Sequence, residues 1–152
     1  MKGMSLIVKV IAELVKGFII LFGIYIILNG HLSPGGGFAG GVIIAASYIL
    51  VTLAFGRERA MKELSERGSH LLDDIGVLSF WFIAVLGWII AGQAFFSNFI
   101  QRFAPGSPFQ ILTSGIILAC NIAIGIKVGS SLFAVFVALA HFEPAGEGDD
   151  WK

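Results

Sequence analysis

The chain has 152 residues, of which 57% are hydrophobic and only 13% are charged, and its formal net charge is zero. Its mean hydropathy of +0.90 is far above that of soluble domains, whose surfaces need charge, so the composition predicts an integral membrane protein. The zero net charge gives no basis for nucleic-acid binding, and a single cysteine, Cys120, excludes a disulfide within the chain.

Apolar segments define the predicted fold. A helix that crosses a bilayer needs about 20 mostly apolar residues, and four segments of the chain approach or exceed that length. We therefore predict one all-α integral membrane domain over residues 1–152. Its four transmembrane helices are expected at residues 6–28, 38–55, 75–96 and 110–132, and the last has room to extend to residue 140.

The first predicted span begins among charged residues. Glu13 follows Lys9 by four residues and precedes Lys16 by three, so both lysines lie on adjacent helical turns. Residues 17–28 alone reach only about 18 Å, so the crossing helix must include this cluster. Glu13 is then either part of a neutralised rim at the membrane surface or a proton-relay carboxylate. A cleaved signal peptide is disfavoured because Leu28-Asn29-Gly30 is not a small-residue cleavage site.

A glycine-rich turn follows, from Asn29 to Gly41, in which seven of thirteen residues are glycine or proline. Backbone that is not helical is tolerated beside lipid only where protein or water covers it. We therefore interpret the turn as a contact site for a partner subunit. The residues predicted to shape the turn and the packing of the next helix are Pro34, Gly35, Gly36, Gly37, Phe38 and Gly41.

His31 is the ionisable residue of this turn. It could donate hydrogen bonds to backbone carbonyls of its own turn or to a neighbouring subunit. It could instead relay protons or ions, or bind a metal. Since no second histidine or carboxylate lies nearby in the sequence, no metal site is predicted. Residues 35–40 match the pattern G-x-G-x-x-G, but they follow an apolar helix rather than a strand, so no nucleotide cofactor is predicted.

Basic residues predict the orientation in the membrane. Residues 56–74 form a charged link, which we expect to include a short helix on the membrane surface, with Asp73 and Asp74 capping the third span. Residues 141–152 form an acidic tail. By the positive-inside rule both termini are cytoplasmic and the turn faces outward across the plasma membrane. Eight of the ten basic residues lie on the predicted inner side: Lys2, Lys9, Lys16, Arg57, Arg59, Lys62, Arg67 and Lys152.

The fourth predicted span carries Lys127, an ionisable residue deep in an apolar helix. A lysine at the centre of a membrane helix costs roughly 2.5 to 3.5 kcal/mol, so such residues pair or line a water-filled cavity. Small residues at intervals of four lead up to it, namely Gly115, Ala119 and Ala123, and they let another helix approach closely. The alternatives are that Lys127 lines an ion or proton path, or that it is structurally paired or extends to the headgroups.

The segment Gly30-His31-Leu32-Ser33-Pro34-Gly35-Gly36-Gly37-Phe38-Ala39-Gly40-Gly41 resembles the B subunit of Mrp/Mnh-type multisubunit cation/proton antiporters. The resemblance extends to the size, the four spans and most of the length, and to Lys127 followed by Gly129 in the last helix. The same module recurs in archaeal membrane-bound hydrogenases and sulfur-reducing complexes.

The resemblance implies a small accessory membrane subunit without catalytic residues or cofactors. Its partners would be the other membrane subunits of the complex and the lipid bilayer, and the complex would transport Na⁺ and H⁺. The subunit would form or brace the ion path, with Lys127, His31 and Glu13 as candidates. The alternative is a structural spacer whose polar residues pair internally, and a stand-alone transporter is disfavoured by the few buried charges.

Overall fold

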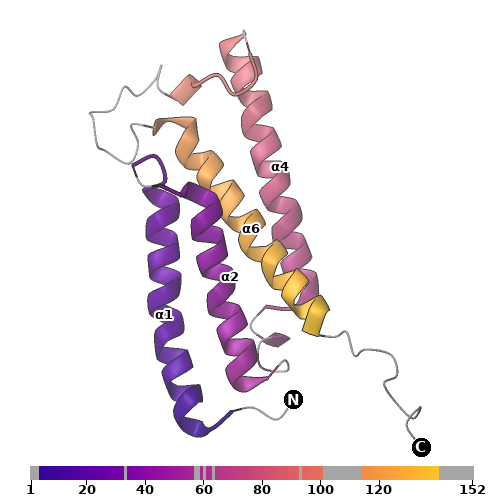
Figure 1. Cartoon of the computed structure of the whole chain (residues 1–152). Coiled ribbons are helices and arrows are strands. Elements are labelled where there is room, and N and C mark those ends of the chain that lie inside the picture. The colour runs from indigo at the N-terminus through magenta and orange to yellow at the C-terminus, as the bar shows by residue number, and fades with distance from the viewer. Residues whose placement is uncertain are drawn as a thin grey trace, which may run out of the picture.

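The computed structural model describes residues 4–32, 34–56, 59, 61–62, 64–92, 94–100 and 114–140. Within these residues the chain forms four long helices, each apolar and long enough to cross a membrane, which confirms the predicted all-α class and the four potential spans. Figure 1 shows them as α1 (Leu6–Leu28), α2 (Gly36–Phe55), α4 (Glu66–Ala91) and α6 (Ile116–Ala140).

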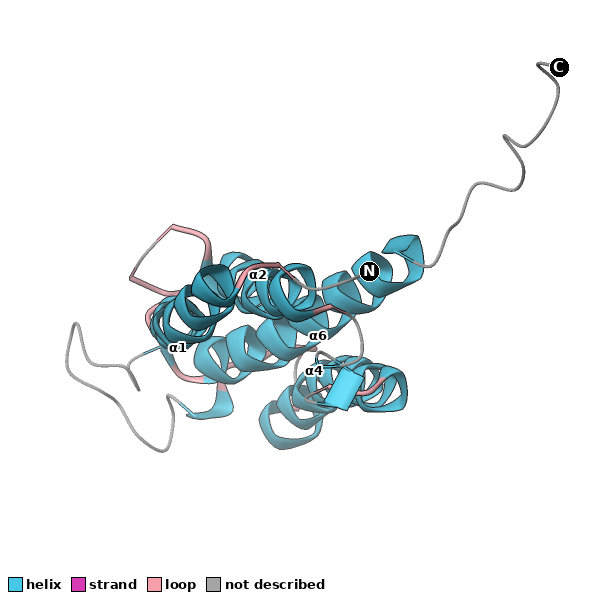
Figure 2. Cartoon of the chain, turned by 90° about the horizontal axis from the view of Figure 1, so that it is seen from below, coloured by secondary structure: helices cyan, strands magenta, loops and turns pink. Residues whose placement is uncertain are grey.

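The four helices lie in a curved row, and helices consecutive in sequence run in opposite directions, so the neighbours α2 and α6 run parallel. α2 packs against α1 on one side and α6 on the other, and α4 packs on the far side of α6. Figure 2, a view along the helices, shows α6 between α2 and α4. The start of α1 and the end of α6 lie toward the same end of the bundle (Figure 1). Which side of the membrane this end faces remains a prediction from the basic residues.

The third helix differs most from the predicted span. It begins at Glu66 rather than at residue 75, because the Ser65 hydroxyl accepts a hydrogen bond from the Gly68 backbone nitrogen at 3.1 Å and so caps the helix. It ends at Ala91, before Gly92 in the left-handed conformation (φ 68°). The prediction that Asp73 and Asp74 cap this helix was wrong, since both lie within it.

The boundaries of the second and fourth predicted spans also shift. α2 begins at Gly36, so the glycines before Phe38 extend it by two residues. α6 continues without a break to Ala140 and includes the apolar extension, while residues 110–113 lie outside the described part of the chain. The predicted tail, residues 141–152, lies outside it as well.

Close helix contact explains why glycine recurs along α2 and α6. A Cβ atom added to Gly41 of α2 would lie 2.7 Å from the carbonyl oxygen of Gly125 and 2.9 Å from Val128 Cβ, both on α6. A larger residue at Gly41 would therefore force α2 away from α6. Gly41, which the sequence predicts to shape the packing of this helix, thus packs against α6 of the same chain.

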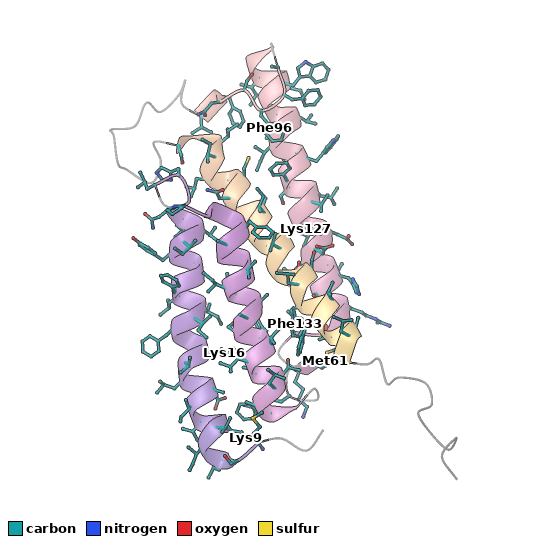
Figure 3. The ribbon with its side chains drawn as sticks, viewed as in Figure 1. Lys9, Lys16, Met61, Phe96, Lys127 and Phe133 are labelled. Carbon is teal, nitrogen blue, oxygen red and sulfur yellow. The ribbon has the colours of Figure 1, made fainter. Side chains whose placement is uncertain are left out.

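A buried cluster holds the end of α6 against α2. Phe133 and Val137 are almost completely buried, and Tyr48, Met61 and Leu64 pack against them. Figure 3 shows Met61 beside Phe133 at the lower part of the bundle. This cluster ties the link that follows α2 to α6, and α4 starts directly after it.

Candidate functional site

Lys127 lies midway along the bundle (Figure 3). In α6 it is preceded by Ile116–Ile126 and followed by residues up to Ala140. At 1.5 Å per residue, these stretches place it about 17 Å from the start of the helix and about 20 Å from its end. If α6 crosses a bilayer, Lys127 is therefore near the middle of the hydrocarbon layer rather than near a headgroup.

The Lys127 ammonium is held by two oxygen atoms. Nζ donates to Asp73 Oδ1 at 2.8 Å and to Ser131 Oγ at 2.7 Å. The Ser131 hydroxyl in turn donates to the same Asp73 oxygen. We call these three residues the Lys127–Asp73–Ser131 cluster. Its charged side chains are part-buried, with exposed fractions of 40% for Lys127 and 30% for Asp73.

Small residues on α4 bring the two helices close enough for this cluster. A Cβ atom on Gly76 would lie 2.8 Å from Lys127 Cβ and 2.9 Å from its backbone nitrogen. One turn before Asp73, the buried Ser69 hydroxyl donates to the carbonyl oxygen of Ser130 at 2.8 Å. Ser69, Asp73 and Gly76 thus hold one face of α4 against α6 over successive turns.

Lys127 could be predicted as an unusual residue from the sequence, but its partner Asp73 could not. The two residues are 54 positions apart, and the sequence predicts Asp73 as a helix cap because negative charge is favourable at a helix N-terminus. The available signal was the spacing of Ser69, Asp73 and Gly76, which places small and polar residues on one helical face. That face is typical of close contact with another membrane helix.

Glu13 lies apart from this cluster, toward the start of α1. Its carboxylate pairs with Arg59 of the link, with 3.2 Å between Oε1 and Nη2, and Lys9 and Lys16 lie on the same helix. More than half of each side chain in the pair is exposed. The Lys9 ammonium lies 5.8 Å from the Phe55 ring centroid. Both lysines are labelled in Figure 3.

The glycine-rich turn packs against the first part of α6. Gly35 (φ 119°) and Gly36 (φ 53°) have positive φ angles that most side chains disfavour. A Cβ atom on Gly37 would overlap the Asn121 backbone, and the Gly37 nitrogen donates to Asn121 Oδ1 at 3.4 Å. Asn121 was not predicted, because one amide in an apolar helix gives no sign of what it faces.

Two side chains near the turn keep buried polar atoms without partners. Among the described residues, His31 Nδ1, His31 Nε2 and Asn121 Nδ2 have no hydrogen-bond partner. The His31 ring therefore donates no hydrogen bond to a backbone carbonyl of the described turn, which was one of the roles predicted from the sequence. Pro34 lies within the turn, Phe38 extends outward with 63% of its surface exposed, and Ser33 is outside the described residues.

The three candidates are not brought together. His31 lies at the turn after α1, Lys127 midway along α6, and Glu13 near the opposite end of α1. The structure instead joins Lys127 to Asp73 and Ser131. This arrangement, four apolar helices with a charged pair between two of them in the described part of the chain, defines a multi-pass helical membrane protein.

Comparison with known proteins identifies the family. Residues 7–134 match the family described as "Domain related to MnhB subunit of Na+/H+ antiporter", and the chain belongs to this family. This confirms the resemblance found in the sequence.

Relatives of this chain include an archaeal and a bacterial protein. It is 36% identical over 130 residues to "Uncharacterized protein MJ1307" of Methanocaldococcus jannaschii, a match that covers 83% of this chain and 48% of that protein. It is 38% identical over 64 residues to "Putative antiporter subunit mnhB2" of Staphylococcus aureus, covering 42% of this chain and 45% of that protein. The matches thus span about half the length of these relatives.

A solved structure has the same fold. A chain in the structure of the membrane-bound sulfane sulfur reductase, an archaeal respiratory membrane complex, superimposes with a TM-score of 0.74 and 31% sequence identity. The match covers 87% of this chain and 56% of that chain. Relatives of this protein are therefore found among antiporter subunits and in a respiratory membrane complex.

Proposed function

We propose that this protein is an accessory membrane subunit of a multisubunit cation/proton antiporter, or of a respiratory complex that contains antiporter-like subunits. In this proposal it performs no catalysis itself, and the Lys127–Asp73–Ser131 cluster lines a path for Na⁺ or protons. The observation that carries the proposal is the ion pair between Lys127 and Asp73, at 2.8 Å, which lies midway along α6 and in the first third of α4.

The cost of this pair argues for a role in transport. A lysine or an aspartate at the centre of a membrane helix costs roughly 2.5 to 3.5 kcal/mol on insertion scales, and such residues mark ion paths and proton relays. Ser69, Gly76 and Gly41 already provide close packing and hydrogen bonding between helices. A structural spacer would need neither charge, although it remains the alternative function.

The outer surface supports assembly with other membrane subunits. Only 17% of the most apolar window of α1, and the same share for α4, is buried inside the chain. The unpartnered atoms of His31 and Asn121 lie beside the turn that the sequence predicted to meet a neighbour. We propose that neighbouring subunits cover the turn, including Pro34 and Phe38, and that His31 is the second candidate for an ion or proton role.

Charge removal at Lys127 tests the proposal. In the assembled complex, Lys127→Met keeps most of the volume but removes the proton-binding group, so Na⁺- or H⁺-coupled transport should fall by about a hundredfold if the amine carries the transferred proton. Lys127→Arg should restore part of the transport, because arginine pairs with Asp73 but stays protonated. Transport in vesicles and recovery of the complex are measured together.

Lys9→Met is the matched control, because Lys9 lies near the Phe55 ring at the end of the bundle and outside the cluster. It should leave transport close to that of the unmodified complex. Full transport in an assembled Lys127→Met complex would favour the structural spacer for this cluster and leave His31 as the better candidate.

A further inference from the structure

We infer that an apolar groove of this chain binds an acyl chain of a phospholipid with an anionic headgroup, and that the Lys16 ammonium contacts the lipid phosphate at one end of the groove. The inference goes beyond the proposed function, because it concerns a bound lipid rather than a transported ion. It does not depend on the Lys127–Asp73–Ser131 cluster.

The groove has a volume of about 380 Å³ and lies between the four long helices and the link. Its lining is apolar apart from Tyr48 and Ser130. Apolar cavities of proteins stay dry, and the helices around this one are long and apolar enough to cross a membrane. The groove is therefore suited to hydrocarbon rather than to water or a polar ligand.

The size of the groove favours a lipid chain over a partner helix. One turn of an α-helix, about 10 Å wide and 5.4 Å long, occupies about 420 Å³, which is more than the groove holds. A partner helix could insert only side chains and would leave part of the lining without contacts, at the cost of dispersion energy. An acyl chain is narrower and flexible, so it can follow the groove along its length.

Lys16 lies beside the groove. It extends from α1 toward α2 (Figure 3), and its Nζ lies 5.2 Å from the ring centroid of Tyr48, which lines the groove. On α1, Lys16 precedes Ile24 by eight residues and Ile27 by eleven, so the three share one helical face. Ile24 and Ile27 also line the groove. The same face of α1 thus combines an apolar surface with a positive charge at one end.

The position of Lys16 along the bundle suits a phosphate. Tyr48 and Leu64 of the link pack against the same buried cluster, so Lys16 marks the end of the groove nearer the link. Tyr48 is seven residues, about 10 Å, from Phe55 at the end of α2. The headgroup region is about 5 to 7 Å deep on each side of a bilayer, and a lysine side chain can extend toward it.

Charge determines which headgroup fits. An ammonium has three N–H donors, so Lys16 can contact a phosphate oxygen while it remains over the Tyr48 ring. The basic residues predict that this end of the bundle faces the cytoplasm, where the membrane surface carries anionic lipids that attract lysine and arginine. An anionic phospholipid therefore matches both the apolar groove and its charged end.

Photo-crosslinking tests the inference in the purified complex, reconstituted in phosphatidylcholine vesicles. Two probes carry the same photoreactive acyl chain, one with the anionic phosphatidylglycerol headgroup and one with the zwitterionic phosphatidylcholine headgroup. Mass spectrometry locates the labelled peptides. The anionic probe should label the groove-lining segments of α1, α2 and α6 about fivefold more than the zwitterionic probe, the factor expected for one basic side chain at a membrane surface. Equal labelling of these segments by the two probes would overturn the inference.

Substitution of Lys16 tests the headgroup contact. Lys16→Met should lower labelling by the anionic probe to the level of the zwitterionic one, whereas Lys16→Arg keeps the charge and should retain the preference. Lys9→Met is the matched control, because Lys9 is on the same helix but lies near Phe55 rather than beside the groove. A preference that persists in Lys16→Met would contradict the assignment of the phosphate to Lys16.

Filling the groove tests the acyl-chain site. Ile24→Trp places a larger side chain in the groove and should lower labelling by both probes severalfold. Leu21→Trp is the control, because Leu21 is also exposed on α1 but does not line the groove. Unchanged labelling in an assembled Ile24→Trp complex would reject the site, and if that variant fails to assemble, the Lys16 variants decide. Groove segments that stay unlabelled while other parts of the complex are labelled would mean that a neighbouring subunit fills the groove. None of these outcomes depends on transport, so the lipid site and the proposed function can fail separately.

Discussion

At the scale of single residues, the strongest expectation concerns the coupling between Lys127 and Asp73. Asp73→Asn leaves the ammonium without its carboxylate, and Lys127→Met leaves the carboxylate without its ammonium, so each single change should destabilise the chain. The double variant has no unpaired charge. It should be more stable than the sum of the single effects predicts, with a coupling of about 0.5 to 3 kcal/mol. Thermal midpoints in detergent give the values.

Glu13 and Arg59 provide the matched control for this cycle, since they also form an ion pair but are more than half exposed. Exposed pairs contribute about 0 to 1 kcal/mol, so Glu13→Gln with Arg59→Gln should show little coupling. Equal coupling in the two cycles would mean that Lys127 and Asp73 interact no more strongly than a surface pair.

At this scale the sequence predicted which residue is unusual, but not which distant residue it contacts. Lys127 could be predicted as an unusual residue because an amine in an apolar helix is costly wherever it lies. Asp73 could not be identified as its partner, since the local charges around it favoured a surface link. The sequence predicted that His31 lies in a turn. The contact of Asn121 with the same turn could not be predicted, because Asn121 is distant in sequence and reaches the turn only through the packing of α6.

At the scale of elements, the contact between α4 and α6 depends on Gly76. Gly76→Ala places a methyl group 2.8 to 3.0 Å from backbone and Cβ atoms of α6, which cannot give way as the end of a flexible side chain could. We expect a loss of about 1 to 3 kcal/mol, as is typical of overpacking. We also expect reduced Na⁺- or H⁺-coupled transport, because the shift separates Lys127 from Asp73.

Gly17→Ala is the control at this scale, because Gly17 is also inside a helix and a Cβ atom there meets nothing within 4 Å. It should be neutral or slightly stabilising, since alanine favours helix more than glycine does. An equally harmless Gly76→Ala would show that α4 and α6 are less closely packed than the structure indicates.

The helices themselves could be predicted because apolar segments of about 20 residues have few alternatives. The start of α4 could not be predicted in this way. Its first turns are polar and do not resemble a membrane span. They are nevertheless helical, because Ser65 caps the helix and Ser69 donates a hydrogen bond to Ser130 of α6. A cap and a tertiary hydrogen bond thus override the hydropathy signal.

At the scale of the whole molecule, the turn precedes α2 and the charged link follows it, so the two lie at opposite ends of the bundle. The basic residues predict that the link is cytoplasmic. In a Cys120→Ala background, Leu32→Cys should react with an impermeant maleimide in intact cells, whereas Lys62→Cys should react only after permeabilisation. These positions leave the Ser65 cap intact. The reverse pattern would invert the orientation, and labelling of both in intact cells would contradict four spans.

The position of α4 in the row has a mechanical consequence. It packs along α6 and makes no comparable contact with α1 or α2 in the described part of the chain, so a neighbouring subunit that pulls or tilts α4 loads one interface only. That interface contains the ion pair. A small sliding motion of α4, of the kind that packed helices undergo, would change the distance between ammonium and carboxylate directly. Movement of a neighbouring subunit, transmitted through α4, would then separate the Lys127 ammonium from the Asp73 carboxylate.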